Sequence, residues 1–344
     1  MFKKLLGKFN KGLGIDLGTC HTLIYQQDRG IVVNESSVVA INNRTDQILA
    51  IGEEARKMLG KTPPHITASK PLEFGIISDF EVAEKMLKYF ISRVQTSKLP
   101  FSSMPRVVIG VPLDVTAVEK KAVEDVILSA GASEVFLVEN IIATAIGARV
   151  PIQDASGNMV VNLGGGLSEV AVISLDGIVN WKVTRVAGMT LDKDIINFAR
   201  EEFNLVLGEM VAEDIKKKIG SAVELDEPLE MPMRGRDVVS GLPKEVHVSS
   251  DQIRNAIIKS VRKILDTIKA TLETTPPELV ADIYQKGIIL TGGTAQLKGI
   301  DKFFSDNIQI PVHLADDSQT CAVRGMGVLL DDEPLLKDVV VPAA

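Results

Sequence analysis

The residues of this chain whose types and spacing point most directly to chemistry lie in three glycine-rich turns. Each turn follows a short apolar run, and small residues there let backbone N–H groups approach a bound anion closely. After the third turn, a predicted helix at 297–305 would point its first N–H groups at the same ligand. The turns predict a site for a nucleotide polyphosphate and consist of Gly18, Thr19 and Cys20, of Gly164, Gly165 and Gly166, and of Gly292, Gly293 and Thr294.

The first two turns belong to a pattern that occurs twice. Residues 14–25 and residues 160–173 each predict an apolar strand, a tight turn and a second strand, and a Gly-Ile-Val triplet follows each copy. The repeat predicts two similar domains that grip one polyphosphate from opposite sides. The chain has no P-loop and no G-x-G-x-x-G helix opening, so P-loop and Rossmann folds are disfavoured.

The spacing of apolar residues predicts the elements that position these turns. Short apolar runs predict strands at 38–41, 48–51, 106–111 and 135–138, and a helical period predicts helices at 53–59, 81–94, 141–148, 192–203, 209–219 and 251–272. Thr116 and Glu119 have the spacing of a capping box, so a helix should begin there and end near Gly131. Alternating strands and helices predict a mixed α/β architecture.

The composition narrows the class of protein. The 344 residues are 45% hydrophobic, which is enough for two domains or one large bilobed domain. No apolar run approaches the length of about 18 residues that a membrane span needs, and no signal-peptide core lies near the start. The net charge of −7 disfavours nonspecific nucleic-acid binding. Two distant cysteines, Cys20 and Cys321, favour a reducing compartment, and Cys20 is interpreted as a small filler rather than a nucleophile.

Two segments are candidates for contact with a membrane surface. In residues 1–12, the apolar side chains of Phe2, Leu5, Leu6 and Phe9 share one helical face, and four lysines accompany them. This pattern predicts a short amphipathic helix on an anionic membrane, with a disordered basic tail as the alternative. The second segment carries Leu99 and Phe101 between a predicted helix and a predicted strand, where loops are usually polar. These two side chains either enter the bilayer or fold back onto the core.

The chain resembles the actin/Hsp70/sugar-kinase ATPase superfamily and, within it, the MreB family of bacterial actins. The resemblance covers nearly the whole chain, with specific matches at 34–40, 85–91, 219–222, 276–279 and 290–293. It implies an α/β, actin-like ATPase fold in which two similar domains with inserted subdomains surround a nucleotide cleft. The implied divisions are a membrane-binding segment at 1–12, domain I at 13–150 with an insertion at 34–75, domain II at 151–320 with an insertion at 188–243, and a return to domain I at 321–344.

The resemblance also implies roles for individual residues. Asp16 would hold Mg²⁺ through its water shell, and Gly18, Thr19 and Cys20 would form the first phosphate loop. Gly164, Gly165 and Gly166 would form the second loop. Glu213 and Lys216 would contact the ribose and the adenine of ATP or ADP, and Gly292, Gly293 and Thr294 would lie beside the α-phosphate and the adenosine.

Four positions depart from the family pattern around one phosphate. Asn140 stands where the family has the glutamate that positions the lytic water, and Asn162 stands where it has a metal-facing aspartate. Leu167 replaces a threonine near the γ-phosphate, and His21 replaces an asparagine. Either these changes are drift in a working ATPase, or hydrolysis is weakened while binding is retained. Glu139 could take over from Asn140, although a chain neighbour tends to point elsewhere.

We therefore expect a cytoplasmic, membrane-associated bacterial actin that binds ATP with Mg²⁺, hydrolyses it slowly and assembles filaments. Its expected partners are other copies of itself, an anionic membrane surface and the cell-wall elongation machinery, whose scaffolding would maintain cell shape. One alternative is a hydrolysis-impaired paralogue that co-assembles with an active bacterial actin. The other is a small-molecule kinase of the same superfold, which Asn140 and Asn162 disfavour because a kinase needs a catalytic aspartate.

Overall fold

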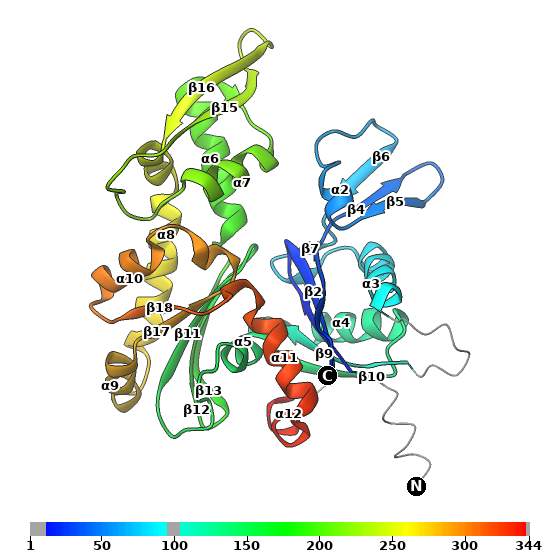
Figure 1. The fold of residues 1–344 in the computed structure, drawn as a ribbon, viewed down its shortest axis with the longest axis vertical. Coiled ribbons are helices and arrows are strands. Elements are labelled where there is room, and N and C mark those ends of the chain that lie inside the picture. Colours follow the sequence, from blue (N-terminus) through cyan, green and yellow to red (C-terminus); the bar gives the residue numbers. More distant parts are fainter. Residues whose placement is uncertain (1–11, 95–103, 342–344) are drawn as a thin grey trace. The chain divides into compact units, whose positions relative to one another are not determined.

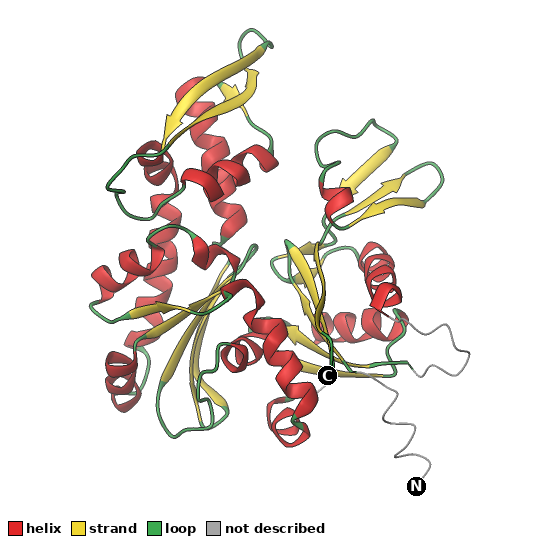
Figure 2. Ribbon diagram, in the orientation of Figure 1, coloured by secondary structure: helices red, strands yellow, loops and turns green. Residues whose placement is uncertain are grey.

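The chain divides into two compact units, and each is described by itself. The computed structural model describes residues 12–94 and 104–341 (Figure 1). Unit 1 takes the chain up to Ala155, the short segment Ile173–Ile178 and the residues from Gln319 onward. Unit 2 takes Ser156–Val172 and Val179–Ser318. Helices and strands alternate along both units, which confirms the α/β fold class (Figure 2).

Unit 1 is built on a five-stranded sheet in the order β10-β9-β1-β2-β3. Its strands are β1 (Leu13–Leu17), β2 (His21–Gln26), β3 (Gly30–Ser36), β9 (Arg106–Val111) and β10 (Glu134–Glu139). The first three strands pair antiparallel, whereas β1, β9 and β10 run parallel to one another. The first glycine turn joins β1 to β2 at the end of the central strand, where ligands of parallel α/β sheets commonly bind.

The two faces of the unit 1 sheet carry different residues because successive side chains of a strand point to opposite sides. Large apolar residues of β1 and β9 share a core with α3 (Phe80–Val94) and α4 (Ala117–Ser129). On the other face, the glycines at positions 14 and 110 leave room for Met326 of α11 (Cys321–Asp331). The predicted capping box of Thr116 and Glu119 is confirmed at the start of α4.

Helix α11 lies directly against α5 (Asn140–Gly147). A Cβ atom on Gly147 would lie 1.8 Å from the carbonyl oxygen of Cys321, and one on Gly325 would lie 1.7 Å from that of Ala143. The two helix backbones are therefore in contact, and only glycine fits at either position. This close packing holds α5, which begins at Asn140, in a fixed place within unit 1. The last helix is α12 (Glu333–Val339).

A smaller sheet follows β3 within unit 1. It has the order β5-β4-β6 and is formed by β4 (Val39–Asn42), β5 (Gln47–Ile51) and β6 (Ile66–Ser69). This sheet has a small core of its own, which consists of Val38, Ala40 and Ala55. Ala55 belongs to the short helix α2 (Glu53–Arg56). A short hairpin leads from this sheet to α3. Its two strands, β7 (Leu72–Glu73) and β8 (Ile76–Ile77), have two residues each.

Unit 2 repeats the strand order of unit 1. Its sheet runs β13-β12-β11-β17-β18, so the second predicted hairpin takes the places that β1, β2 and β3 hold in unit 1. Its strands are β11 (Asn158–Leu163), β12 (Ser168–Ser174), β13 (Gly177–Thr184), β17 (Ile288–Thr291) and β18 (Val312–Leu314). The repeated sequence pattern thus corresponds to two sheets of matching topology.

One core holds the unit 2 helices on their sheet. Val161 and Val172 of the sheet share it with Leu191 of α6 (Gly188–Phe203) and Ile257 of α8 (Ser250–Glu273). The helices are α6 (Gly188–Phe203), α7 (Glu209–Ile219), α8 (Ser250–Glu273), α9 (Pro277–Lys286) and α10 (Ile300–Ile308). A second small sheet contains β14 (Leu205–Val206), β15 (Glu230–Asp237) and β16 (Pro243–Ser249). Among the described residues, no helix is long and apolar enough to cross a membrane.

The prediction that a helix follows the third glycine turn at 297–305 was wrong in its start. The turn runs into the short 3-10 helix η2 (Gly293–Gln296), and α10 begins only at Ile300. Gly299 adopts a left-handed conformation with φ of 68°, which an α-helix cannot accommodate. The backbone N–H groups nearest to the third turn are therefore those of η2 rather than those of α10.

Candidate functional site

The first glycine turn is held in a fixed shape by hydrogen bonds at all three of its residues. The N–H of Gly18 donates to the carbonyl of His21 over 3.0 Å, and that of Ser37 donates to the carbonyl of Cys20 over 2.9 Å. The hydroxyl of Thr19 accepts from the N–H of Gly75 over 2.8 Å. Because the turn is already ordered by the protein, its backbone need not rearrange to contact a ligand.

Asp16, the predicted Mg²⁺ residue, lies on β1 two residues before this turn. Removal of water from around its carboxyl raises the pKa of Asp16 from 3.8 to about 7. A desolvated carboxyl favours a nearby cation, which would restore the charged form. The surroundings of Asp16 therefore suit a bound metal ion.

Asn140 is the first residue of α5 and lies beside β9. Its Oδ1 atom is buried and has no hydrogen-bond partner among the residues that the structure describes. Gly110 makes room for it, since a Cβ there would lie 2.6 Å from Oδ1. A buried amide oxygen in this state can accept a hydrogen bond from a bound water. Its neighbour Glu139 has a raised pKa because it is desolvated, an effect that Lys120 partly opposes.

The second glycine turn joins β11 to β12 and is also closed by the backbone. The N–H of Gly164 donates to the carbonyl of Leu167 over 3.0 Å. The side chain of Leu167 is buried, with 8% of it exposed. The leucine that replaces the family's threonine therefore acts here as a packing residue, and its backbone closes the turn.

The structure brings the second and third turns together within unit 2. The carbonyl of Gly164 accepts from the Thr294 hydroxyl over 2.7 Å and from the N–H of Gly188 over 3.2 Å. The carbonyl of Gly165 accepts from the N–H of Met189 over 2.8 Å. The start of α6 therefore binds two carbonyl groups of the second turn.

Lys216, predicted to contact the nucleotide, reaches this cluster from α7. Its Nζ atom donates to the carbonyl of Gly188 over 2.8 Å and lies 2.8 Å from Oδ1 of Asp192. Both side chains of this ion pair are largely buried, at 12% and 13% exposed. Glu213, one turn earlier on the same helix, pairs with Lys217 over 2.6 Å. Lys216 is therefore anchored, whereas the Glu213 pair lies nearer to solvent.

Sequence reasoning missed two residues at this site. Asp192 fixes the amine of Lys216, and its place at the start of a predicted helix offered the only signal for it. Glu169 is fully buried on β12, and its carboxylate accepts from Nδ2 of Asn162 over 3.3 Å. The signal for Glu169 was an acid in a strand that is otherwise apolar, just after a glycine turn.

Asn162 also contacts the third turn on its other side. Its Oδ1 atom lies 3.5 Å from the hydroxyl of Thr291, which is buried on β17. A Cβ on Gly292 would approach this Oδ1 to 2.7 Å and the carbonyl oxygen of Leu163 to 2.3 Å. Gly292 has a φ of 85°, so both its conformation and the space around it require glycine.

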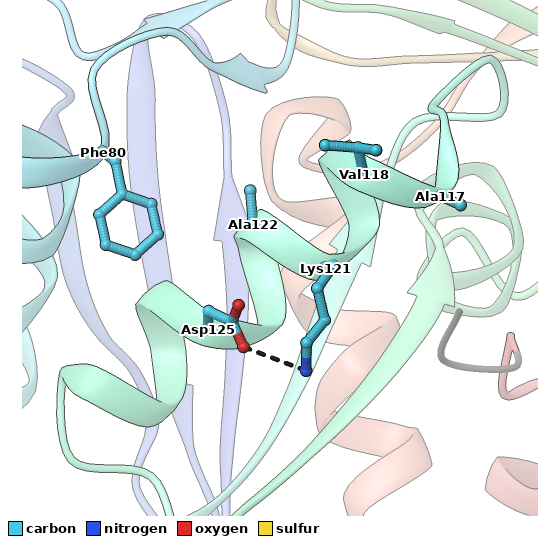
Figure 3. A pocket seen from close by; sticks show the side chains of 6 residues that line it. All are labelled: Phe80, Ala117, Val118, Lys121, Ala122 and Asp125. Atoms are coloured by element: carbon cyan, nitrogen blue, oxygen red, sulfur yellow. Dashed lines mark ion pairs between the residues drawn. The ribbon is translucent and has the colours of Figure 1, made fainter.

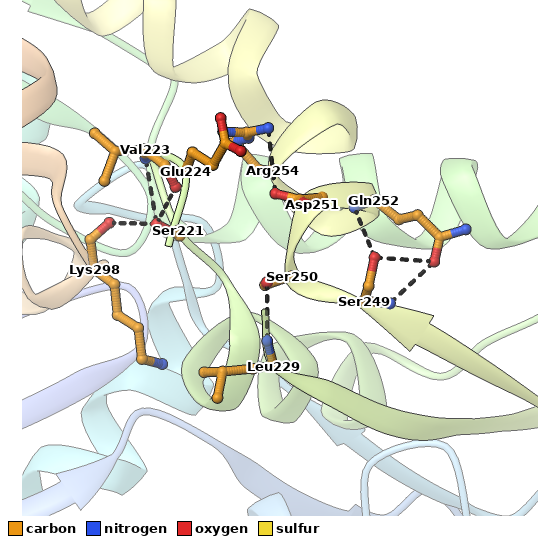
Figure 4. Close-up of polar contacts among 10 residues, drawn as sticks. All are labelled: Ser221, Val223, Glu224, Leu229, Ser249, Ser250, Asp251, Gln252, Arg254 and Lys298. Atoms are coloured by element: carbon orange, nitrogen blue, oxygen red, sulfur yellow. Dashed lines mark hydrogen bonds and ion pairs between the residues drawn. The ribbon is translucent and has the colours of Figure 1, made fainter. Parts of the chain in front are cut away.

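A polar network fixes the segment that follows α7 (Figure 4). The hydroxyl of Ser221 donates to the carbonyls of Val223 and Lys298, at 2.7 Å and 3.1 Å. Ser249 and Gln252 form the capping box of α8, and the Ser250 hydroxyl accepts from the N–H of Leu229 over 3.1 Å. The end of α7, and with it Lys216, is thereby tied to the segment between η2 and α10.

The residues present suit Mg²⁺ bound through a nucleotide rather than in a protein cage. No group of three or more His, Cys, Asp or Glu side chains that could hold a metal occurs in the described part of the chain. Mg²⁺ usually keeps several waters and binds one or two carboxylates together with substrate phosphates. Asp16 is a desolvated carboxyl group of the kind that this arrangement uses.

A separate hollow of about 440 Å³ lies on unit 1 and is lined by residues of α3 and α4. Figure 3 shows Phe80 at the start of α3 opposite α4, whose Lys121 and Asp125 form an ion pair of 3.1 Å. Val118 on the same helix is 79% exposed. The remaining lining residues are Ala117 and Ala122.

The six predicted membrane residues fall outside the described part of the chain. They are Phe2, Leu5, Leu6, Phe9, Leu99 and Phe101.

Comparison with known proteins gives a consistent assignment. The model of the MreB/Mbl protein family matches residues 10–338. The cell shape-determining protein Mbl of Bacillus subtilis is 43% identical over 324 residues, which is 94% of this chain and 97% of that protein. The structure of MreB5 of Spiroplasma citri bound to ADP matches with a TM-score of 0.90 and 37% identity, covering 96% of this chain and 98% of the other.

Two further structures extend the comparison. MreB5 of Spiroplasma citri bound to AMPPNP matches with a TM-score of 0.89 and 38% identity over 93% of this chain and 96% of that one. A chain of the MamK double helical filament matches with a TM-score of 0.80 over 94% of this chain and 100% of that one. At 20% identity, MamK shares the fold alone.

Proposed function

The chain belongs to the MreB/Mbl family, and from this premise we propose that it is a bacterial actin that binds ATP with Mg²⁺ and assembles filaments. The phosphates would contact residues 18–20 in unit 1 and residues 164–166 in unit 2. Lys216 and Glu213 would contact the ribose and the adenine, and Gly292, Gly293 and Thr294 would lie beside the α-phosphate. ADP and AMPPNP bound to MreB5 of Spiroplasma citri support nucleotide binding.

The observation that carries this proposal is the convergence at Gly164. Its carbonyl accepts from the Thr294 hydroxyl over 2.7 Å, while the anchored Lys216 lies against Gly188 over 2.8 Å. Residues that the sequence assigned to phosphate, α-phosphate and ribose contacts thus meet in one place within unit 2. Such ordered backbone turns bind anions without a rearrangement of the chain.

Mg²⁺, when bound, neutralises charge on the phosphates, and Asp16 is the residue that would hold it through water. Asn140 would hold a water through its buried Oδ1 atom, which has no partner among the described residues. As a neutral amide it orients the water but takes no proton from it. Hydrolysis is therefore slow, while binding, which depends on backbone N–H groups, persists.

The cellular role follows from family membership. Filaments of this chain would lie in the cytoplasm on an anionic membrane, contacted through residues 2–9 and through Leu99 and Phe101. There they would scaffold the cell-wall elongation machinery and maintain cell shape. The relatives named as cell shape-determining proteins support this role.

A second candidate function is favoured by the altered residues at the site. Asn140, Asn162 and Leu167 together suit a paralogue that co-assembles with an active bacterial actin and hydrolyses little itself. A small-molecule kinase of the same superfold is the third candidate, and it would not pellet as a polymer.

One preparation tests the proposal. Affinity for a fluorescent ATP analogue, sedimentation with and without ATP, and phosphate release are measured together. We expect tight binding, ATP-dependent pelleting and slow release. Pelleting only with an added active family member would favour the paralogue. The absence of nucleotide binding would reject all three functions.

A further inference from the structure

The last carbonyl groups of α7 are capped by the amine of Lys298, which lies in the connector between η2 and α10. An α-helix leaves its last four carbonyls without partners inside the helix. In α7 the N–H of Gly220 donates to the carbonyl of Lys216 over 3.0 Å. The Nζ atom of Lys298 donates to the carbonyl of Lys217, over 3.4 Å, and to that of Lys218. A cation at this end also interacts favourably with the negative end of the helix dipole.

The basic side chains in the last turn of α7 are held by carboxylates instead. The cap on the helix end comes from a segment 80 residues later in the sequence. Each lysine of the last turn pairs with an acid: Lys216 with Asp192 over 2.8 Å, Lys217 with Glu213 over 2.6 Å and Lys218 with Asp214 over 2.8 Å.

The backbone of Lys298 joins the same two segments. Its carbonyl accepts from the N–H of Ala222 over 2.8 Å and from the Ser221 hydroxyl over 3.1 Å (Figure 4). A Cβ on the next residue, Gly299, would lie 2.3 Å from Cγ2 of Val223, so the connector packs tightly on the residues that follow α7. Lys298 therefore binds the end of α7 and the residues after it with both its side chain and its backbone.

The connector is continuous with the third glycine turn. The carbonyl of Thr294 accepts from the N–H of Leu297 over 3.1 Å, and the hydroxyl of Thr294 donates to the carbonyl of Gly164 over 2.7 Å. Leu297 is buried, which fixes the residue before Lys298 in unit 2. Lys298 thus connects the turn proposed for the α-phosphate to the helix that carries the proposed ribose and adenine contacts.

We propose that Lys298 is a positioning residue for the nucleoside: by capping α7, it holds Glu213 and Lys216 where the ribose and the adenine bind. This inference rests on the proposed ATP site and names a residue that acts there through a helix rather than by contact with the ligand. The phosphates bind to backbone N–H groups of the glycine turns, which do not depend on this cap. Lys298 therefore acts on the affinity for the nucleoside part of ATP and not on the affinity for its phosphates.

Four full-length proteins test the proposal: the wild type, Lys298→Met, Lys298→Arg and Lys302→Met. Methionine removes the amine but keeps an unbranched side chain, whereas arginine retains a cation with N–H donors. Lys302→Met is the matched control, because Lys302 is an exposed lysine of α10 and its replacement makes the same change in charge. The affinities for ATP and for inorganic tripolyphosphate are measured with Mg²⁺ by displacement of a fluorescent ATP analogue.

We expect Lys298→Met to bind ATP about tenfold more weakly, which is the effect of losing about one hydrogen bond to a charged group. Its affinity for tripolyphosphate should equal that of the wild type. Lys298→Arg and Lys302→Met should match the wild type for both ligands. Hydrogen exchange at residues 213–219, measured without a ligand, should become faster in Lys298→Met alone.

Unchanged ATP affinity or unchanged hydrogen exchange in Lys298→Met would overturn the proposal. An equal loss of affinity for ATP and tripolyphosphate would also overturn it, because such a loss indicates general damage to the site rather than a displaced α7. A wild type that binds neither ligand would reject the proposed function instead, and the exchange measurement would still report whether Lys298 holds the helix.

Discussion

The N–H of Gly75 donates to the hydroxyl of Thr19 over 2.8 Å, which ties the first glycine turn to the β7–β8 hairpin. Phe74 and Gly75 form the tip of that hairpin, with φ angles of 50° and 75°. Thr19 is 5% exposed, so the bond is shielded from water. The shape of the first turn therefore depends on a segment that lies more than fifty residues later in the sequence.

Removal of this hydroxyl should loosen the hairpin. Thr19→Val keeps the shape of the side chain but leaves the Gly75 N–H without its acceptor, which typically costs about 1–3 kcal/mol. Thr19→Ser, which retains the hydroxyl, is the matched control. Urea unfolding measures the stability, and hydrogen exchange at residues 72–77 should become faster in Thr19→Val alone. Equal exchange in both variants would mean that the hairpin holds itself.

Gly292→Ala should abolish the nucleotide site. The added Cβ would meet the carbonyl oxygen of Leu163 at 2.3 Å, and a φ of 85° is strained for alanine by about 1–3 kcal/mol. Gly208→Ala is the control, because a Cβ there meets nothing within 4 Å. The unfolding temperature and the affinity for fluorescent ATP should both fall in Gly292→Ala and stay unchanged in Gly208→Ala. Normal ATP binding by Gly292→Ala would remove the third turn from the site.

Asn140→Glu should accelerate hydrolysis. A carboxylate at this position can orient the water and accept its proton, and such a group typically contributes about 10²-fold or more in rate. Asn140→Gln is the control, because it lengthens the side chain without adding a carboxylate. Phosphate release should rise only in the glutamate variant, with ATP affinity nearly unchanged. A wild type that already releases phosphate at the rate of Asn140→Glu would show that another group positions the water.

Deletion of residues 2–9 should release the protein from anionic vesicles. Each lysine near an anionic surface contributes about 1 kcal/mol, and filament formation multiplies such weak contacts. The deletion removes Lys3, Lys4 and Lys8 together with four apolar side chains. Co-sedimentation with anionic and with neutral vesicles measures the effect, and ATP affinity should not change. Undiminished binding to anionic vesicles would leave Leu99 and Phe101 as the anchor.

Asp194→Asn should stabilise the protein at neutral pH. Desolvation raises the pKa of Asp194 on α6, although a hydrogen bond from Ser260 and the charge of Lys263 on α8 oppose the shift. Because the folded pKa lies above the unfolded value, this group's contribution to stability falls as pH rises from the unfolded pKa through the folded one. We expect Asp194→Asn to unfold at a temperature about 1–2 °C higher than the wild type at pH 7. Asp194 makes the unfolding temperature of the wild type fall between pH 4 and pH 7, and this contribution should be lost in the variant.

The control for this prediction is Asp214→Asn on α7, an exposed aspartate that pairs with Lys218 over 2.8 Å. It should leave the pH dependence of the unfolding temperature unchanged. A lower unfolding temperature for Asp194→Asn at pH 7 would show that attraction to Lys263 exceeds the cost of burying the charge.

Local features of the fold were readable from the sequence. The capping box of Thr116, the strand at 106–111 and the helix at 209–219 agree with the structure because each depends on neighbouring residues. The start of α10 was missed because a single left-handed residue, Gly299, delays a helix whose apolar spacing begins earlier. Periodicity locates a helix well but does not report the backbone conformation at its first residue.

By itself the sequence determined the family, the repeated hairpin and the positions of three glycine turns, since turn chemistry and strand patterns are local. Only the tertiary structure decided which side chains meet there. Thr294 reaches Gly164 across 130 positions of sequence because β17 pairs with β11. Asn162 finds Glu169 for a similar reason, across the hairpin of β11 and β12. The contacts of the altered residue Asn162 are therefore set by the order of the strands, and no local sequence pattern encodes that order.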